Sequence, residues 1–202
     1  MAALTQGDLH VQAAVPVMEI RQFHMKVQAN AHPAFYLEGM LSEEAGEEGI
    51  RIPLSGTTVR LGAGDRLLFT GILEEAEVVQ EGHGYEIIMR GAAATRLLDC
   101  RKKARSFQDV SMTYRQVMEQ VLADTPGAGL DLHVEDRVIG RPLYQLEETD
   151  WGFLKRLAGH LGTAIMPSVY PVAAQIHVGQ PAGRSITAGT GTEKERSWYD
   201  RD

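Results

Sequence analysis

Cysteine is nearly absent from this sequence, since Cys100 is the single one among 202 residues. One thiol excludes an internal disulfide bond and any zinc site built from cysteines. Apolar runs are short, and none approaches the roughly eighteen residues that a membrane-spanning helix needs. Residues 1–6 lack the basic and apolar regions of a secretory signal. These absences predict a protein that is made in the cytoplasm and has no membrane span.

An excess of positive charge is also missing. The chain has 20 Lys and Arg against 27 Asp and Glu, which gives a net charge of −7 and a pI near 5.5. Binding to phosphate backbones requires a concentrated basic face. We therefore expect no nucleic-acid partner. The hydrophobic share of 44% and the charged share of 23% are typical of a globular protein with its own core.

Motifs that carry catalysis or hold a cofactor are not found. The seven histidines form neither His-x-x-x-His nor His-Glu-x-x-His, and His24 and His32 make only a weak pair across a proline turn. No Gly-x-Ser-x-Gly elbow is present. The neighbouring carboxylates Glu147 and Glu148 lie in a predicted strand, where adjacent side chains point to opposite faces. The expectation is a protein that is not an enzyme, with no catalytic residues, no cofactor and no metal site.

Period-two alternation of apolar residues dominates the first half of the chain. It begins near Val17 and predicts strands over 17–29, 34–41, 67–79 and 85–91, with two short ones at 51–54 and 58–61. The acidic, glycine-containing stretch 43–49 is interpreted as a solvated hairpin loop. Short strands at this spacing are typical of a small antiparallel barrel. Residues 1–91 are therefore predicted to form a first β-barrel domain.

Helical signals replace this alternation over residues 92–129, which we interpret as a helical connector. A short helix is expected at 92–98, and Thr113 begins a capping box that introduces a second helix. The connector also carries the one basic cluster in the chain. That cluster has two interpretations, a strand or loop that balances nearby acids or a contact with another subunit. Its members, the candidate subunit-contact residues, are Arg101, Lys102, Lys103 and Arg105.

The last part, residues 130–202, alternates again and contains one strong helix signal. Strands are predicted at 130–134, 143–146, 163–166 and 173–178, followed by a loose tail. The helix at 149–161 begins at a capping Thr, has an acid at the positive end of the helix dipole and ends at a Gly. Its apolar stripe is predicted to be buried. This structural signature comprises Thr149, Asp150, Trp151, Phe153, Leu154, Leu157 and Gly162.

Two stretches carry a resemblance to a known family. An aromatic strand end, the run Glu148-Thr149-Asp150-Trp151, then Leu-x-Arg-Leu-Ala and a closing Gly, resembles the signature of the baseplate-hub family. This family includes phage late control D proteins and the N-terminal part of VgrG spikes. The stretch 105–122 is similar to the same family. Both stretches occur in the family's order, and the resemblance covers roughly residues 60–165.

The resemblance implies a fold and a role. The fold class is mainly β (α+β), with two small antiparallel β-barrel domains linked by short helices. The second barrel is expected to be incomplete, because family members usually run much longer. The implied role is a structural baseplate hub subunit of a contractile phage tail or a phage-tail-like injection particle. There, a homotrimer adapts the hexameric tube to the trimeric spike.

The same resemblance suggests partners and an alternative. The partners would be two further copies of the chain, the tail tube protein, the spike protein and other baseplate proteins. The protein would be made in the bacterial cytoplasm and assembled into a virion tail or an extracellular injection particle. Because some tail hubs carry such domains, a tail-associated cell-wall hydrolase is the alternative function.

Overall fold

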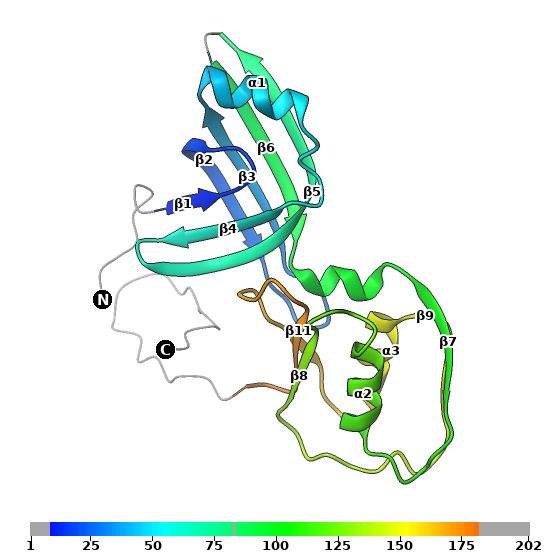
Figure 1. Cartoon of the computed structure of the whole chain (residues 1–202). Helices are drawn as coiled ribbons and strands as arrows, with labels where there is room; N and C mark the ends of the chain where they lie inside the picture. The colour runs from blue at the N-terminus through cyan, green and yellow to red at the C-terminus, as the bar shows by residue number, and fades with distance from the viewer. Residues whose placement is uncertain (1–8, 83, 182–202) are drawn as a thin grey trace, which may run out of the picture.

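Six strands form the first unit of the protein, and they curve into a nearly closed barrel (Figure 1). The computed structural model describes residues 9–82 and 84–181. The sheet is antiparallel, with the order β1-β4-β5-β6-β3-β2. Its strands are β1 (Leu9–Gln12), β2 (Val17–Lys26), β3 (Ala34–Leu41), β4 (Thr58–Ala63), β5 (Arg66–Glu81) and β6 (Gly84–Ala92).

The alternation in the sequence places this unit's core. Along β3 and β6 every second side chain is buried, including Phe35, Leu37, Ile87 and Met89. These side chains form one apolar cluster inside the barrel. The strands predicted over 34–41 and 85–91 are confirmed, and the pattern over 67–79 belongs to one long strand, β5.

The acidic stretch 43–49 is a helix, and the hairpin-loop interpretation was wrong. Helix α1 (Glu43–Arg51) begins at Ser42, whose hydroxyl accepts a hydrogen bond from the Ala45 amide at 3.2 Å. Its glycines face the barrel, and an added Cβ at Gly46 would lie 2.1 Å from the ring of Tyr85. These glycines allow the helix to lie close to the barrel, although the sequence analysis interpreted them as part of a hairpin loop. The strand predicted over 51–54 is also wrong, because the end of α1 and a coil occupy those residues.

The second unit combines two small sheets with two α-helices. Strands β10, β11 and β8 form one sheet, in which β8 and β11 run parallel, and β7 pairs antiparallel with β9. Neither sheet closes into a barrel within the described residues. The elements are the 3₁₀ helix η2 (Ala94–Asp99), β7 (Lys102–Phe107), α2 (Tyr114–Leu122), β8 (Gly129–Leu132), β9 (Leu143–Thr149), α3 (Asp150–His160), β10 (Ile165–Pro167) and β11 (Gln175–Val178).

Helix ends in this unit follow the local signals. Thr113 and Gln116 form the predicted capping box at the start of α2. Thr149 caps α3 by accepting a hydrogen bond from the Gly152 amide at 3.1 Å. Gly162 has a φ of 72°, the left-handed conformation that ends a helix. The helix predicted at 92–98 is the six-residue 3₁₀ helix η2, which begins two residues later.

Helices α2 and α3 bury their apolar faces in a second core, and this core includes side chains of both the predicted connector and the last part of the chain. Val117, Met118, Leu154 and Leu157 are fully buried there beside Ile176 of β11. The mainly β fold with a few helices is as predicted. No described helix has the length and apolar character that crossing a bilayer requires. The predicted tail beyond residue 181 lies outside the described residues.

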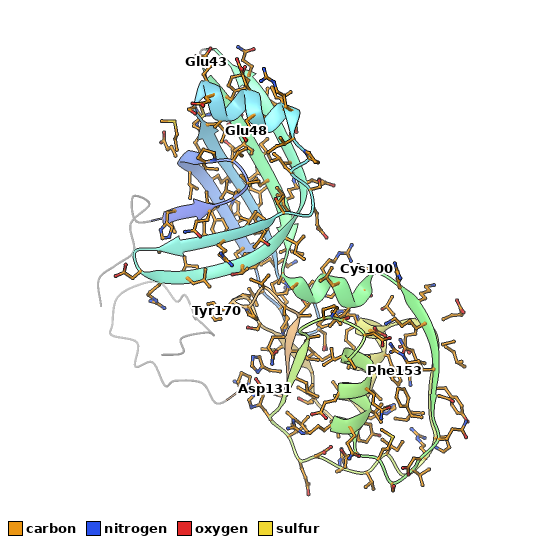
Figure 2. The ribbon with its side chains drawn as sticks, viewed as in Figure 1. Glu43, Glu48, Cys100, Asp131, Phe153 and Tyr170 are labelled. Atoms are coloured by element: carbon orange, nitrogen blue, oxygen red, sulfur yellow. The ribbon has the colours of Figure 1, made fainter. Side chains whose placement is uncertain are left out.

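The two units are fastened together by hydrogen bonds that involve the backbone. At the turn between β2 and β3, the backbone amide of Asn30 donates to the Ile165 carbonyl at 2.8 Å, and Oδ1 of Asn30 accepts from the Ile165 amide at 2.9 Å. The segment between β10 and β11 crosses to the barrel, where the Thr70 amide bonds the Val169 carbonyl at 2.7 Å. Val169 is 1% exposed and belongs to the barrel core. Its neighbour Tyr170 lies at the junction in Figure 2.

Candidate functional site

A buried carboxylate organises the polar interior of the second unit. Asp150, the first residue of α3, is 3% exposed. Its Oδ1 accepts hydrogen bonds from Arg105 at 2.8 Å and from the Gln145 amide group at 2.9 Å, and its Oδ2 accepts from Lys103 at 2.7 Å. Two positively charged side chains and an amide group offset the cost of burying this acid. The network joins α3 to β7 and β9.

An exposed acid completes this network at the surface. Asp124 Oδ2 accepts from Lys103 at 2.9 Å and also from Arg105. The hydrogen bonds and charges of these two cations lower the pKa of the Asp124 carboxyl. Lys103 and Arg105 therefore bridge a buried and an exposed carboxylate, so that the end of α2 is tied to the start of α3.

A bulge in β9 positions the amide of this network. The register between β7 and β9 shifts between Lys103 and Arg105, and Glu147 has a φ of 48°, which is uncommon for a residue with a side chain. The fully buried Gln145 accepts from Arg105 at 2.9 Å and donates to the Glu148 carbonyl at 2.9 Å. The extra residue lies between Gln145, which points inward as Leu143 does, and Glu148, which pairs with Arg156 of α3 at 2.7 Å.

The basic cluster is divided by the fold. Lys103 and Arg105 point inward and pair with acids of the same chain. These two residues therefore lie on a strand and balance nearby acids, which is the first of the two interpretations given for the cluster. Arg101 and Lys102 are exposed. The subunit contact predicted for the cluster remains a prediction, and these two exposed residues are the ones available to make it.

The apolar side chains of the signature are buried, as predicted. Trp151 is 2% exposed, and Phe153, Leu154 and Leu157 are fully buried. Phe153 stacks on Phe107 of β7 with ring centroids 5.7 Å apart. Trp151 also contacts the first unit, because the ring of His32 lies 4.3 Å from it. The signature helix is therefore part of the joint between the units as well as of the second core.

A series of polar contacts surrounds His32 next to Trp151. Nδ1 of His32 lies 3.1 Å from the Thr95 hydroxyl, and Nε2 lies 3.5 Å from Asp99, an ion-pair distance too long for a good hydrogen bond. Burial lowers the pKa of His32, and Asp99 only partly opposes this. Burial raises the pKa of Asp99, but a hydrogen bond from Thr149 and the charge of His32 outweigh it and leave this pKa lowered.

Other sequence candidates do not come together as a site. His24 contacts Gln22 and Tyr36, whereas His32 contacts Trp151, so the two histidines have different surroundings. Cys100 is exposed, with its thiol 3.5 Å from the Arg96 carbonyl. Of the adjacent carboxylates, Glu148 pairs with Arg156.

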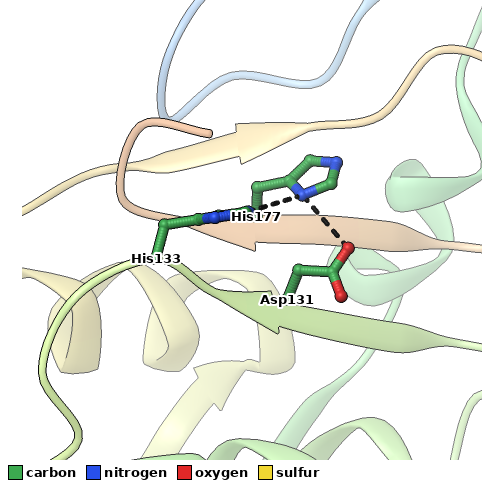
Figure 3. Close-up of side chains that lie close together, drawn as sticks. All are labelled: Asp131, His133 and His177. Atoms are coloured by element: carbon green, nitrogen blue, oxygen red, sulfur yellow. Dashed lines mark hydrogen bonds and ion pairs between the residues drawn. The ribbon is translucent and has the colours of Figure 1, made fainter. Parts of the chain in front are cut away.

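One cluster was missed by sequence analysis. Asp131 of β8, His133 just after that strand and His177 of β11 lie together, and their ligand atoms are all within 4.8 Å of one another (Figure 3). A signal for part of it was present, because Asp131 and His133 are two residues apart in a predicted strand and so share one face. Nothing local in the sequence indicates that His177 lies beside them.

The fold and this arrangement define a class of protein. A nearly closed barrel is joined to a smaller β unit, and Asp150 of the signature pairs with Lys103 and Arg105 of β7. Groups arranged in this way fix the positions of the elements within one chain, as in a structural protein. Comparison with known proteins identifies the family. The model of the family described as phage tail baseplate hub (GPD) matches residues 21–167, and the chain belongs to this family.

Solved structures share the fold. A tail protein from Neisseria meningitidis MC58 superposes with a TM-score of 0.61 at 16% identity, covering 84% of this chain and 50% of that one. A 43 kDa tail protein of prophage MuSo2 from Shewanella oneidensis gives a TM-score of 0.64 at 17% identity, covering 83% and 52%.

A third solved structure comes from a secretion system. The E. coli c3393 protein, a type VI secretion component described as similar to T4 phage tail proteins, gives a TM-score of 0.62 at 14% identity, covering 84% and 48%. This chain thus spans about half the length of these relatives. A search of curated proteins found no match.

Proposed function

We propose that this protein is a baseplate hub subunit that forms a homotrimer between a hexameric tail tube and a trimeric spike. Membership of the hub family supports a structural role in a phage tail. With two β units per chain, three chains per ring place six β units around a three-fold axis. The mechanism is symmetry matching, with tube, spike and other baseplate proteins as partners and the virion tail or an injection particle as the location.

The observation that carries the proposal is the fastened joint between the units. Asn30 exchanges two hydrogen bonds with Ile165, and Val169 is buried in the barrel core. A symmetry adaptor must hold its two β units at a set separation and angle, because a flexible pair would not present six regular positions. Buried side chains and backbone hydrogen bonds across a joint supply this stiffness.

Exposed side chains of the second unit support a subunit contact. Tyr144 and Leu146 are 47% and 68% exposed on β9, which pairs with β7, the strand that begins at Lys102. Closed rings cover such apolar surface and such strand edges. The acidic residues of α1 are a candidate partner for Arg101 and Lys102. Figure 2 places Glu43 and Glu48 far from Cys100, so a pairing of α1 with Arg101 or Lys102 would join two chains.

A reconstruction of the native particle tests the proposal. The expected result is three copies of the chain at the level between tube and spike, with the two β units alternating around the axis. Six identical copies at this level, or none around the axis, would contradict it.

A charge-reversal experiment tests the contact. Reversing both Arg101 and Lys102 to Glu should reduce incorporation of the protein into particles. The same change at Lys26 and Arg60, exposed on the barrel, is the matched control and should have little effect. Clearing of purified peptidoglycan by the protein alone would favour the hydrolase alternative.

A further inference from the structure

Three metal-ligating side chains gather on one face of the small three-stranded sheet. Asp131 lies on β8, His133 follows that strand, and His177 lies on β11. In the parallel pairing of these strands, His177 is the register partner of Asp131. Residues 131 and 133 alternate onto the same face, and the His133 amide bonds the Val178 carbonyl at 2.9 Å, which continues the pairing past the strand end.

The distances between the ligand atoms suit a tetrahedral ion. Nδ1 of His177 lies 3.2 Å from Nε2 of His133 and 3.3 Å from Oδ2 of Asp131 (Figure 3). Zinc bonds to nitrogen and oxygen of about 2.0–2.2 Å set tetrahedral ligands about 3.3–3.5 Å apart. The third separation, between the ligand nitrogen of His133 and the ligand oxygen of Asp131, is at most 4.8 Å. Because Asp131 and His133 are exposed, a small rotation of either side chain closes it.

A hydrogen atom on Nδ1 of His177 cannot bond to both of its neighbours, whereas a metal ion can be bound by all three side chains. Nδ1 of His177 carries at most one hydrogen, yet it faces an imidazole nitrogen and a carboxylate oxygen in two directions. Without that hydrogen, lone pairs of the carboxylate and of His177 face each other. A cation placed between the three atoms contacts all of their lone pairs at once.

We propose that Asp131, His133 and His177 form a zinc-binding site that ties β8 to β11. Two imidazoles and a carboxylate are a donor set that borderline metals such as Zn²⁺ prefer over Mg²⁺ or Ca²⁺. Three protein ligands leave a fourth tetrahedral position for water or for a side chain of another subunit. His177 is 6% exposed, so its ring is held by packing before any ion arrives.

The site is independent of the proposed hub function and departs from the expectation of no metal. That expectation depended on spacing along the chain, and here two of three ligands are near neighbours while the third is brought in by strand pairing. Clamping β8 to β11 stabilises the sheet from which the segment carrying Val169 extends to the barrel. Zinc would therefore strengthen the joint between the units.

The experiment uses the 202-residue protein after treatment with a chelator. Titration with Zn²⁺, followed by calorimetry and by the rise in melting temperature, should give one ion per chain. Co²⁺ in place of Zn²⁺ should give the visible absorption of a tetrahedral site. Asp131→Asn and His133→Gln, both exposed positions, should each weaken Zn²⁺ affinity at least about tenfold, since even residues behind the ligands cost that much.

Matched controls separate this site from adventitious binding. His24→Gln removes an exposed histidine of the barrel and should leave affinity and stoichiometry unchanged. Circular dichroism checks that the metal-free variants remain folded. Binding that survives in both site variants with wild-type affinity, or that is lost equally in His24→Gln, would overturn the proposal. So would the absence of saturable Zn²⁺ binding to the wild type.

Discussion

Asp150 shows how a single side chain connects several elements. Its carboxylate accepts hydrogen bonds from Lys103 and Arg105 of β7 and from Gln145 of β9, although it lies at the start of α3. A buried charge of this kind adds little net stability compared with an apolar replacement, but removing one partner leaves the others uncompensated. The residue therefore specifies how β7, β9 and α3 fit together.

Removal of this carboxylate should be costly. Asp150→Ala leaves two cations and the amide of Gln145 without their shared acceptor, and we expect a loss of about 2–4 kcal/mol in the free energy of unfolding, since Lys103 and Arg105 are partly exposed. Urea titration measures it. Asp124→Asn, which removes the exposed acid from the same cations, should have a clearly smaller effect. Equal effects of the two changes would show that the buried network is not the source of stability.

His32 should make stability depend on pH. Burial lowers its pKa below the ordinary value of 6.5, so just below that pH the unfolded chain binds more protons than the folded one. Stability should fall as the pH drops from about 7.5 to about 5.5. In His32→Phe, which keeps a ring against Trp151, the fall should be smaller. A residual fall is expected, because burial also lowers the pKa of His160.

Melting temperatures of the two proteins over that pH range make the measurement. His24→Gln is the control and should retain the wild-type slope. The result that would count against the role of His32 is an identical slope in His32→Phe and the wild type. Asp99 adds a separate loss in stronger acid, since its pKa is lowered from 3.8 and its contribution disappears as the pH falls below that value.

At the scale of elements, α1 illustrates how glycine misleads. Gly46 and Gly49 occur in an acidic stretch and were interpreted as turn residues, yet both lie in a helix on the side that packs against β5 and β6. Glycine lowers helix propensity by roughly 0.5–1 kcal/mol relative to alanine. Here that cost is offset because the helix axis approaches the sheet closely. Helix α3 contains a glycine of the opposite kind, since Gly159 has open space around it.

The two glycines should respond to alanine in opposite directions. Gly46→Ala places a methyl group 2.1 Å from Cγ of Tyr85 and should destabilise the protein by about 1–3 kcal/mol through overpacking. Gly159→Ala meets nothing within 4 Å and should stabilise it by roughly 0.5–1 kcal/mol through helix propensity. Denaturant midpoints measure both. Stabilisation by Gly46→Ala would mean that α1 does not pack as closely as described.

At the scale of the whole molecule, the joint decides whether the two units behave as one body. The second unit sends Val169 into the barrel core, and the barrel sends His32 against Trp151 of the second core. Each unit therefore places one buried or mostly buried side chain against the core of the other. Such reciprocal burial couples the unfolding of the two parts, and we expect one cooperative thermal transition in the wild type.

An aspartate at position 169 should break that coupling. Val169→Asp buries a charge without a partner and should cost about 2–4 kcal/mol, which splits the single calorimetric transition into two. Val172→Asp is the matched control, because this valine lies in the same segment but is 52% exposed. A single transition in Val169→Asp, lowered no more than in the control, would show that the joint does not carry the coupling.

The sequence by itself determined the local structure and the family. Period-two alternation specified β3 and β6, the capping box at Thr113 specified the start of α2, and the run from Thr149 to Gly162 specified a buried helix and the resemblance. These features depend on residues within a few positions of one another. Steric preference and capping hydrogen bonds act over that range, so the chain carries their signal locally.

Only the tertiary structure decided which distant residues meet. It turned Lys103 and Arg105 inward to Asp150, left Arg101 and Lys102 outside, and set His177 beside Asp131 by a parallel pairing of β8 with β11. Strand pairing between distant segments depends on how the whole chain folds back, and hydrogen bonds between backbones carry no residue identity. The particular acids that Lys103 and Arg105 meet, and the place of His177 beside Asp131, follow from that choice, so the sequence alone did not indicate them.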